Sequence, residues 1–413
     1  MTKNVIVIGA GVVGMGCASY LQRHGHAVTV IDRLPPGRAT SYGNGGGIAS
    51  TFVLPLAMPG LMKRYMKYYM DPEGPVSLRW RHMPFMLPFL WKFLKNCSPE
   101  RVKECTEALA AFMPPAYAAW KPLFEDAGLM HLVRHDGGLW VYKDDAAVKK
   151  DWAFWQGRRD KGLAFEVLSE DELRQSEPAI SRDWKAAVLE PDWHHVRNPY
   201  KIVAGLADLV RAKGGKVLEE QVLDFDKGPD GVRAVITDAG RHRCDAVVIA
   251  AGAWSHQLAK KLGSKVPLET QRGYHVMLPK PDVETRHLVV VGSAKIAITT
   301  MEEGVRIVGA SAFPGLDAPP DWRQSQMVLT WGKRVLTGLN TEGMTEWFGE
   351  RPLTPDSLPV LGRSPNFANA FYAFGHSHMG LTTGAITGKL IAESVSGQET
   401  SIDLTPFRID RSY

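Results

Sequence analysis

The sequence predicts an α/β fold that combines a parallel sheet flanked by helices with an α+β region built on an antiparallel sheet. Continuous apolar runs at residues 4–9 and 27–32 indicate the first part, because strands buried on both faces have this pattern. Residues 266–349 indicate the second part, since apolar and polar residues alternate there as in a sheet that faces a cavity. The chain has 413 residues, which favours two packed domains over one.

A βαβ unit is predicted at the start of the chain. A helix follows the first apolar run and continues to about His24, where Gly25 provides the backbone freedom that commonly ends a helix. The glycine-rich residues 40–48 then predict a loop whose backbone approaches a ligand closely. Six prolines interrupt residues 52–95, so this stretch predicts several short helices inserted into the first domain.

The later elements follow from the same patterns. Residues 100–193 are mixed, with short strands such as 139–142. After a helix at 199–213, strands at 216–218 and 231–238 are expected to extend the first sheet. We further expect a buried strand at 243–252, strands at 288–291, 305–308 and 358–361, and a last helix at 380–395.

Composition and charge exclude several classes of protein. Hydrophobic residues make up 45% of the chain and charged residues 23%, as in soluble globular proteins. The net charge of +5 is too small and too dispersed to indicate nucleic-acid binding. The four cysteines are scattered without a CxxC pair, so we expect neither a metal site nor a disulfide framework. We therefore expect the protein to reside in the reducing cytoplasm. Residues 1–6 already run into a strand pattern, so we expect no cleavable leader. No apolar run reaches membrane length, so any membrane contact is expected to be peripheral.

A dinucleotide-binding pattern opens the chain. Gly9-Ala-Gly11-Val-Val-Gly14 lies between the first strand and the first helix, and Asp32 ends the second strand. In this pattern the first glycine forms the tight turn, the second admits a pyrophosphate, and the third lets the helix pack on the strand. The helix N-terminus attracts the phosphates, and Asp32 is placed to bind ribose hydroxyl groups.

Three further features favour FAD over NAD as the dinucleotide. The motif opens the chain, the glycines at 43–47 follow the second strand, and a strand of the type Val-Val-Ile-Ala-Ala-Gly ends at Gly252. Taken together, the motifs resemble the D-amino acid oxidase superfamily of FAD oxidoreductases, and within it the bacterial D-amino acid dehydrogenases. The resemblance covers essentially the whole chain and is carried by residues 5–14, 41–46, 197–200, 250–255, 272–274, 351–362 and 375–383.

The resemblance implies an FAD-binding Rossmann-like domain interleaved with an α+β substrate domain. We expect the first from residues 1–56, 195–265 and 350–413, and the second from residues 57–194 and 266–349. FAD is expected to bind without a cysteinyl link, because no cysteine follows Cys244. The implied cofactor-binding residues are Gly9, Gly11, Val12, Val13, Gly14, Asp32, Arg33, Ser41, Asn44, Gly45, Gly46, Val222, Ala251, Gly252, Trp254, Gly380, Leu381 and Thr382.

The same resemblance implies a substrate site. Arg351 matches the arginine that binds the substrate carboxylate, for which a bidentate guanidinium is well suited; the alternative is a surface arginine paired with Glu350 or Asp356. Tyr274 falls on the strand that would face the flavin, where its hydroxyl would help to bind the substrate carboxylate or line the pocket. The alternative is a tyrosine that only packs in the sheet.

The glycine-rich segment 375–383 leads into the last helix. If the N-terminus of that helix faces the flavin pyrimidine, its dipole favours the anionic reduced ring, with Thr382 and the backbone amides near Gly380 and Leu381 as donors. We place His378 beside the flavin rather than as a base, because hydride transfer from a neutral amine depends on orientation. His376 is equally compatible with a structural role.

The implied reaction is oxidation of a D-amino acid to an imino acid, which hydrolyses to a 2-oxo acid and ammonia, with electrons leaving to an acceptor other than oxygen. The alternatives are oxidation of a cyclic or secondary amino acid such as hydroxy-D-proline, D-proline, glycine, sarcosine or an opine, an FAD-binding subunit of a larger complex, or a nicotinamide dehydrogenase. Residues 191–196 depart from the alanine-preferring members, which leaves the substrate side chain open. The oligomeric state is open too.

Basic and aromatic residues are mixed in 62–69, 79–82 and 85–95. This pattern is compatible with a surface that lies on an anionic bilayer and passes electrons to a membrane quinone. It is equally compatible with helices that pack over the substrate domain and keep a solvated basic face.

Overall fold

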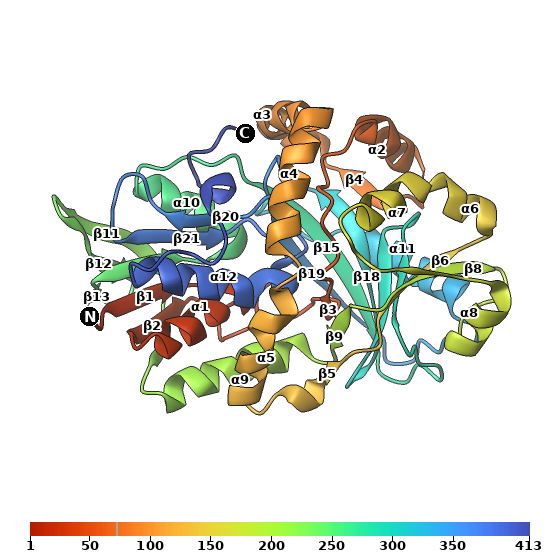
Figure 1. Ribbon diagram of the computed structural model, residues 1–413, viewed down its shortest axis with the longest axis horizontal. Coiled ribbons are helices and arrows are strands. Elements are labelled where there is room, and N and C mark those ends of the chain that lie inside the picture. Colours follow the sequence, from red (N-terminus) through yellow and green to blue (C-terminus); the bar gives the residue numbers. More distant parts are fainter. Residues whose placement is uncertain (72) are drawn as a thin grey trace.

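A six-stranded sheet organises one half of the protein (Figure 1). The structure, a computed structural model, describes residues 1–71 and 73–413, and only the backbone at 62–64. Neighbouring strands are parallel except for the last, which is antiparallel. In spatial order the strands are β10 (Lys216–Glu219), β2 (Ala27–Asp32), β1 (Asn4–Ile8), β14 (Ala246–Ile249), β21 (Ala370–Phe374) and β20 (Val360–Arg363).

Each face of this sheet buries apolar side chains against a different layer. Val5 and Val7 point into a helical layer, whereas Ile6 and Ile8 point to the opposite side, as the alternation of a strand requires. The helical layer contains α1 (Val12–Arg23), α4 (Pro99–Phe112), α5 (Ala116–Asp126), α9 (Pro199–Ala212) and α12 (Gly380–Val395). The opposite layer contains α10 (Ser255–Lys261) and a separate sheet of β11 (Val222–Gly228), β12 (Gly231–Thr237) and β13 (Arg241–Arg243).

This arrangement corrects one strand assignment. Residues 231–238 were expected to extend the first sheet, but β12 pairs with β11 and β13 instead. Its side chains Val232 and Val235 pack on the sheet from outside. The sequence shows the strand but not its partner, because pairing depends on contacts that are remote along the chain.

A nine-stranded sheet forms the other half of the protein, and helix α11 (Arg323–Val335) packs on it. Most neighbours are antiparallel, which confirms the predicted fold class. The strand order is β19 (Thr345–Leu353), β15 (Glu269–Leu278), β18 (Gly304–Phe313), β17 (Ile296–Met301), β16 (Leu288–Val291), β6 (Gly138–Tyr142), β8 (Ala186–Glu190) and β7 (Glu166–Leu168), with β4 (Val76–Leu78) beside β18.

The inserted region is built from short helices, as the prolines predict. It contains α2 (Leu61–Met70), η1 (Trp80–His82) and α3 (Met83–Lys95), which lie at one edge of the molecule, at the top of Figure 1. Of the six prolines, Pro72 lies outside the described residues. The region that follows is more helical than predicted, with α6 (Asp145–Lys150), α7 (Trp152–Arg159) and α8 (Glu170–Ser176) in addition to α4 and α5.

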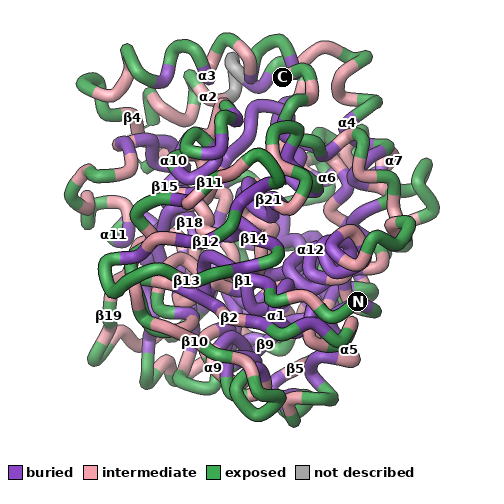
Figure 2. The backbone as a smooth tube through the Cα atoms, turned by 90° about the vertical axis from the view of Figure 1, so that its left-hand side faces the viewer, coloured by how far each residue is buried: buried purple, intermediate pink, exposed green. Residues whose placement is uncertain are grey.

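The two halves are closely connected. Helices α4 and α5 come from the stretch assigned to the substrate domain but pack with α1 and α12, and β19 runs across the proposed boundary at residue 350. A small sheet of β3 (Gly47–Ile48), β9 (His194–Val196) and β5 (Val133–Arg134) joins the two halves. Short 3₁₀ turns occur at η2 (Met130–Leu132), η3 (Gly252–Trp254) and η4 (Thr405–Phe407). Figure 2 shows buried backbone in the middle of the molecule and exposed backbone around its periphery. The domain boundaries stay a prediction.

None of the helices in the described part of the chain combines the length and the apolar character needed to cross a bilayer.

Candidate functional site

A cavity of about 510 Å³ lies between the two large sheets. The ends of β1, β2, β14 and β21 line it from one side, and β15, β18, β19 and the turn between β16 and β17 line it from the other. The carboxyl ends of parallel strands are the usual ligand site of such α/β folds. The cavity is therefore the candidate site.

The glycine motif brings backbone atoms very close together at one end of the cavity. Gly9 has a φ of 113°, and a Cβ added there would lie 2.4 Å from the Ala250 carbonyl oxygen. At Gly11 a Cβ would lie 3.3 Å from Ser41 Oγ, which accepts a hydrogen bond from the Val12 amide (3.0 Å). Gly11, Val12, Val13 and Ser41 all line the cavity, so the helix N-terminus is open to a phosphate.

Gly14, the third glycine of the motif, has a different role from Gly9 and Gly11. It is not among the described residues that line the cavity, and a Cβ there would lie 1.9 Å from the Gly9 carbonyl oxygen. Gly14 therefore lets α1 pack directly on the first turn, which is the role that the motif predicts for its third glycine.

Asp32 is held in place at the same end. Its carboxylate accepts hydrogen bonds from the Ala10 amide (2.7 Å) and the Leu34 amide (3.0 Å). Burial raises the pKa of Asp32, and these two N–H groups partly offset that rise. The neighbouring Arg33 guanidinium lies 4.4 Å from the centre of the Trp254 ring. Val222, Ala251 and Gly252 also line this end, as predicted.

The glycine-rich loop crosses the middle of the cavity. Asn44 and Gly45 line it, while Arg306 Nη1 donates to the Asn44 carbonyl (2.9 Å) and so holds the loop from behind. Gly46 is not among the described lining residues. Its carbonyl accepts a hydrogen bond from the Val196 amide (2.7 Å), so it joins the loop to β9 rather than facing a ligand.

The N-terminus of α12 faces the cavity through Gly380, Leu381 and Thr382. The first amides of a helix have no partner within the helix, so this end attracts negative charge. The Thr382 hydroxyl, predicted as a donor to the flavin, instead accepts from the Ala49 amide (3.1 Å) and donates to the Gly47 carbonyl (3.2 Å). The backbone amides, not this hydroxyl, are the available donors.

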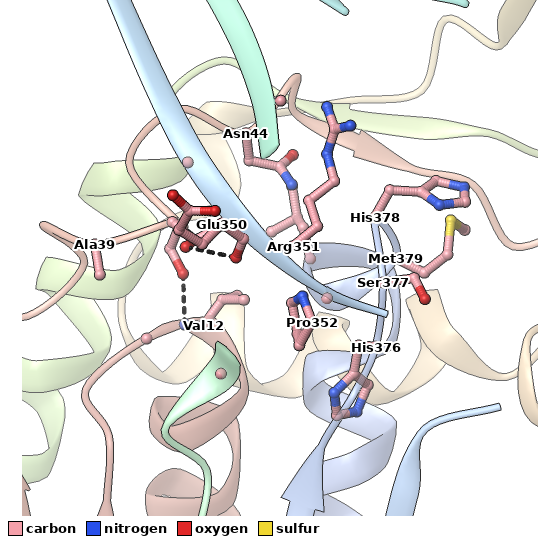
Figure 3. A pocket seen from close by; sticks show the side chains of 18 of the residues that line it. Val12, Ala39, Asn44, Glu350, Arg351, Pro352, His376, Ser377, His378 and Met379 are labelled. Atoms are coloured by element: carbon pink, nitrogen blue, oxygen red, sulfur yellow. Dashed lines mark hydrogen bonds between the residues drawn. The ribbon is translucent and has the colours of Figure 1, made fainter. Parts of the chain in front are cut away.

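Arg351 lies at the far end of the cavity, on β19. Its Nη1 donates to the Ala310 carbonyl (3.0 Å), and the guanidinium lies directly over Gly273 of β15, where an added Cβ would be 2.1 Å from Nη2. Burial lowers the pKa of Arg351 to about 10, so the side chain keeps its positive charge at neutral pH. Figure 3 shows the Arg351 side chain extending between Asn44 and His378.

The structure contradicts the alternative in which Arg351 pairs with a neighbouring acid. Glu350 accepts from Arg272 Nε (2.6 Å) on the other side of the sheet. Asp356 is held by Arg411 (2.7 Å). Both acids have other partners, and the Arg351 guanidinium is left to face the cavity.

Tyr274 does not present its hydroxyl to Arg351. The hydroxyl accepts a hydrogen bond from the Asp321 amide (2.9 Å), and the ring packs with Trp322 and Phe348 in the core of the second half. The side chain of a strand residue points to the face opposite its neighbour's, so Tyr274 turns away from the face on which Gly273 supports Arg351. The expected carboxylate-binding role of its hydroxyl is therefore corrected, whereas Tyr274 does line the cavity, as the other expectation for it held.

The two histidines of the segment 375–383 separate. Both border the cavity, but His378 packs edge-on against Phe52 (5.2 Å between ring centres), whereas His376 Nε2 lies 2.9 Å from Thr387 Oγ1 of α12 (Figure 3). Burial lowers the pKa of both to about 3, and the charge of Arg351 contributes at His378. Both imidazoles are therefore neutral at physiological pH.

Sequence reasoning missed many residues that line the cavity, among them Tyr65, Phe52, Trp140 and Lys295. Tyr65, from α2, interacts electrostatically with Arg351, and burial raises the pKa of its hydroxyl to about 12, so it remains a hydrogen-bond donor. Phe52 and Trp140 add apolar wall, and Lys295 adds a second cation. For Lys295 the sequence offered one signal, the Gly-Ser pair that indicates a turn just before it. Tyr65 was missed because it lies in a stretch whose basic and aromatic composition suggested a membrane surface.

The cavity fits an extended dinucleotide that carries a planar redox ring. It offers a nucleoside end at Asp32, an anion-binding middle at the glycine motif, and a second helix N-terminus beside the apolar wall. The described His, Cys, Asp and Glu side chains form no group suited to a metal ion.

Comparisons with known proteins agree with this geometry. A sequence profile of the family named FAD dependent oxidoreductase matches residues 4–394. A D-amino-acid oxidase and a D-amino acid dehydrogenase, both from Bradyrhizobium diazoefficiens, are 35% and 28% identical, and each comparison covers 98% of this chain and 98% of the relative.

Solved structures show the same fold. Glycine oxidase from Geobacillus kaustophilus has a TM-score of 0.76 and 21% identity, covering 100% of this chain and 99% of its own. L-proline dehydrogenase from P. horikoshii has a TM-score of 0.76 and 20% identity, covering 99% of this chain and 97% of its own.

Proposed function

Because this chain belongs to the FAD dependent oxidoreductase family and is a flavoenzyme, we propose that it oxidises the Cα–N bond of a D-amino acid. The products are an imino acid, which water converts to a 2-oxo acid and ammonia, and two electrons that leave to an acceptor other than oxygen, such as a quinone. The names of the two Bradyrhizobium relatives support the D configuration.

The single observation that carries this proposal is the Arg351 guanidinium at the end of the cavity. It is charged, and its Nη1 is fixed by the Ala310 carbonyl. A guanidinium binds a carboxylate through two parallel hydrogen bonds, which fixes the rest of the substrate in direction as well as position. An amino acid held there would extend its Cα towards the N-terminus of α12.

The protein contributes binding, orientation and charge. When bound, the flavin supplies the hydride acceptor. Arg351 holds the carboxylate, and its positive charge disfavours a protonated substrate amine, which must be neutral to release hydride. Tyr65 can donate a hydrogen bond to the same carboxylate. The free amides at Gly380–Thr382 stabilise negative charge that develops next to them.

We also propose roles for the remaining lining residues. Asp32 binds ribose hydroxyl groups, Arg33 and Trp254 border the adenosine end, and the amides of Val12 and Val13 approach the pyrophosphate. His378 is a neutral wall residue beside the flavin. These assignments rest on the position of each residue around one continuous cavity.

The test combines substrate specificity with one variant. Purified protein is mixed anaerobically with D-, L-, cyclic and N-alkyl amino acids, and loss of the visible flavin absorbance is followed. We expect D-amino acids to bleach the flavin, and Arg351→Ala to lower kcat/KM at least about 100-fold while FAD stays bound. Arg363→Ala, which alters an exposed arginine on β20, the next strand along the chain, should behave as wild type.

Other outcomes select the alternatives. Bleaching by cyclic or N-alkyl substrates alone would make the protein an oxidase or dehydrogenase of secondary amino acids. Bleaching by L-enantiomers alone would contradict the stereochemical assignment. A protein whose flavin no amino acid reduces would be an FAD-binding subunit of a larger complex.

Exposed apolar side chains support a peripheral membrane contact for electron delivery. Half of the large apolar side chains that are exposed in the described chain lie within residues 66–94, including Phe85 (76% exposed), Trp80 (69%) and Trp91 (57%). Exposed Arg79, Arg81 and Lys95 lie among them. Such a mixture suits the interface of an anionic bilayer. The side chains of residues 62–64, which belong to this predicted surface, lie outside the described residues.

Vesicle binding tests this contact. The protein should co-sediment with vesicles of phosphatidylglycerol and phosphatidylcholine but not with pure phosphatidylcholine, and Trp91→Ser should weaken binding several-fold. Trp152→Ser alters an exposed tryptophan of α7, remote in sequence from this surface, and serves as the control. Equal binding by both variants and wild type would contradict the proposal.

A further inference from the structure

The backbone carbonyls of the glycine-rich loop are all engaged by the protein. From residue 42 to residue 47, each of the six successive carbonyls accepts a hydrogen bond. Three side chains of the nine-stranded sheet hold the first four of these carbonyls. The Val196 amide and the Thr382 hydroxyl hold the last two. The loop is therefore fixed along its whole length by groups outside it.

Arg306 of β18 makes two of these contacts. Its Nη1 donates to the Tyr42 carbonyl (3.1 Å) and to the Asn44 carbonyl (2.9 Å), and the side chain is only 5% exposed. Burial lowers the pKa of Arg306 to about 10, so the guanidinium stays positively charged at neutral pH. Hydrogen bonds from a charged donor are stronger than those from a neutral one. Arg306 thus holds the loop firmly on both sides of Gly43.

His275 and Thr299 hold the carbonyls in between. His275 Nδ1 lies 3.1 Å from the Gly43 carbonyl oxygen, and because a carbonyl only accepts, Nδ1 carries the proton. Burial and the charge of Arg306 lower the pKa of His275 to about 3, so the imidazole stays neutral. Thr299 Oγ1, which is also buried, donates to the Gly45 carbonyl (2.9 Å). Three strands, β15, β17 and β18, therefore each supply one donor to the loop.

The glycines of the loop let it lie directly on this sheet. A Cβ added at Gly43 would lie 2.0 Å from Trp347 Cε3, and one added at Gly45 would lie 3.0 Å from Val308 Cγ2. A side chain at either position would push the loop away from the sheet and into the cavity. Both glycines line the cavity. The sheet thus sets how far this part of the loop extends towards a ligand.

The loop offers hydrogen-bond donors to the cavity. Its carbonyls are occupied, so the polar backbone groups that remain are amides. The Gly46 amide donates to Asn44 Oδ1 (2.8 Å), whereas the amides of Gly43 and Gly45 donate to no other group of the described chain. A buried N–H group without an acceptor costs free energy. These two amides therefore suit the acceptor atoms of a bound ligand.

We propose that Arg306, His275 and Thr299 are positioning residues of the FAD site. By holding the carbonyls of residues 42–45, they direct the two free glycine amides to acceptor atoms of the cofactor. Arg306 also places a fixed positive charge behind the loop, which favours the anionic reduced form of the flavin. The inference concerns the cofactor of the family, so it does not depend on which substrate the enzyme oxidises.

The experiment compares matched variants of the holoenzyme. Thr299→Val removes the donor at nearly constant volume, and Thr299→Ser keeps it. The control is Thr300→Val, which alters the next residue of β17, where the buried hydroxyl accepts from the Thr285 amide (2.8 Å) and does not contact the loop. Arg306→Met removes the charge, and Arg306→Lys keeps it. FAD release on dilution is followed by recovery of flavin fluorescence, and the midpoint reduction potential is measured by equilibration with a redox dye.

We expect Thr299→Val to weaken FAD binding about 10-fold, because the Gly45 carbonyl loses its donor and the loop is released there. Thr299→Ser and Thr300→Val should stay within about threefold of wild type. Arg306→Met should weaken FAD binding about 100-fold and shift the midpoint potential to a more negative value. Arg306→Lys should recover most of the potential, since it retains the charge.

FAD affinity within about twofold of wild type in Thr299→Val would overturn the proposal, even if Arg306→Met does not fold. An equal loss of FAD affinity in Thr299→Val and Thr300→Val would overturn it too, since this indicates a general loss of stability. An unchanged potential in folded Arg306→Met would refute the electrostatic role of Arg306. A flavin that no amino acid reduces would contradict the proposed function but leave these measurements decisive for the three residues.

Discussion

Gly273 supports the guanidinium of Arg351, and replacing it with alanine tests whether the position of that group controls catalysis. An added Cβ would lie 2.1 Å from Nη2, 2.4 Å from Cζ and 2.9 Å from Nε. Ordinary contact requires about 3.5 Å, so the guanidinium must move by roughly 1.4 Å. That movement also breaks its 3.0 Å hydrogen bond to the Ala310 carbonyl. Misplacing a binding group by about 1 Å typically costs about 100-fold in rate, or roughly 2.7 kcal/mol.

We therefore expect Gly273→Ala to lower kcat/KM for a D-amino acid about 100-fold, with FAD content unchanged. The assay is steady-state turnover with an artificial electron acceptor, together with the visible flavin spectrum. The control is Gly157→Ala in α7, where a Cβ would meet Leu54 at an ordinary 3.8 Å. If Gly273→Ala retains kcat/KM within about twofold of wild type, the position of Arg351 does not govern turnover and the reasoning fails.

Three other predictions follow from single contacts. Asp32→Ala should weaken FAD binding about 10- to 100-fold and Asp32→Glu far less, as measured by quenching of flavin fluorescence; equal affinities would contradict the ribose role. Glu190→Ala should destabilise the fold by about 3–5 kcal/mol in urea unfolding, because it leaves the buried Arg158, 3.3 Å away, without its counter-charge; replacing both by methionine should cost much less. Burial lowers the pKa of His376 to about 3, so the unfolded chain binds the proton first and the free energy of unfolding falls as pH drops below about 6.5. Between about pH 7 and pH 5, His376→Gln should lose about 2 kcal/mol less stability than wild type, and equal losses would contradict the assigned pKa.

Local patterns predicted the nucleotide-binding part of the fold well. The βαβ unit, the glycine motif, Asp32 and the last helix at 380–395 appear where the sequence places them. Each depends on residues close together in the chain, so periodicity and glycine placement specify it directly. Arg351 was identified from its surrounding motif, and the structure adds that its charge faces the cavity.

Contacts between distant segments decided the rest. Tyr274 was expected at the substrate, but the hydrogen bond from the Asp321 amide draws its hydroxyl into the core. The Thr382 hydroxyl, expected beside the flavin, is used by the loop at Gly47. Sequence can show that such a side chain is able to bond, but not which remote partner is nearest.

The sequence by itself determined that the chain binds a dinucleotide and predicted the turn at which the phosphates bind, since a strand, a tight glycine turn and a helix follow one another there without a break. Only the tertiary structure decided which groups surround the substrate. Arg351, Lys295 and Tyr65 come from strand β19, from the turn before β17 and from an inserted helix. The pairing of β15 with β18 and β19 and the packing of α2 over them bring these residues together. Those contacts are set by burial of apolar surface across the whole chain, which no local pattern records.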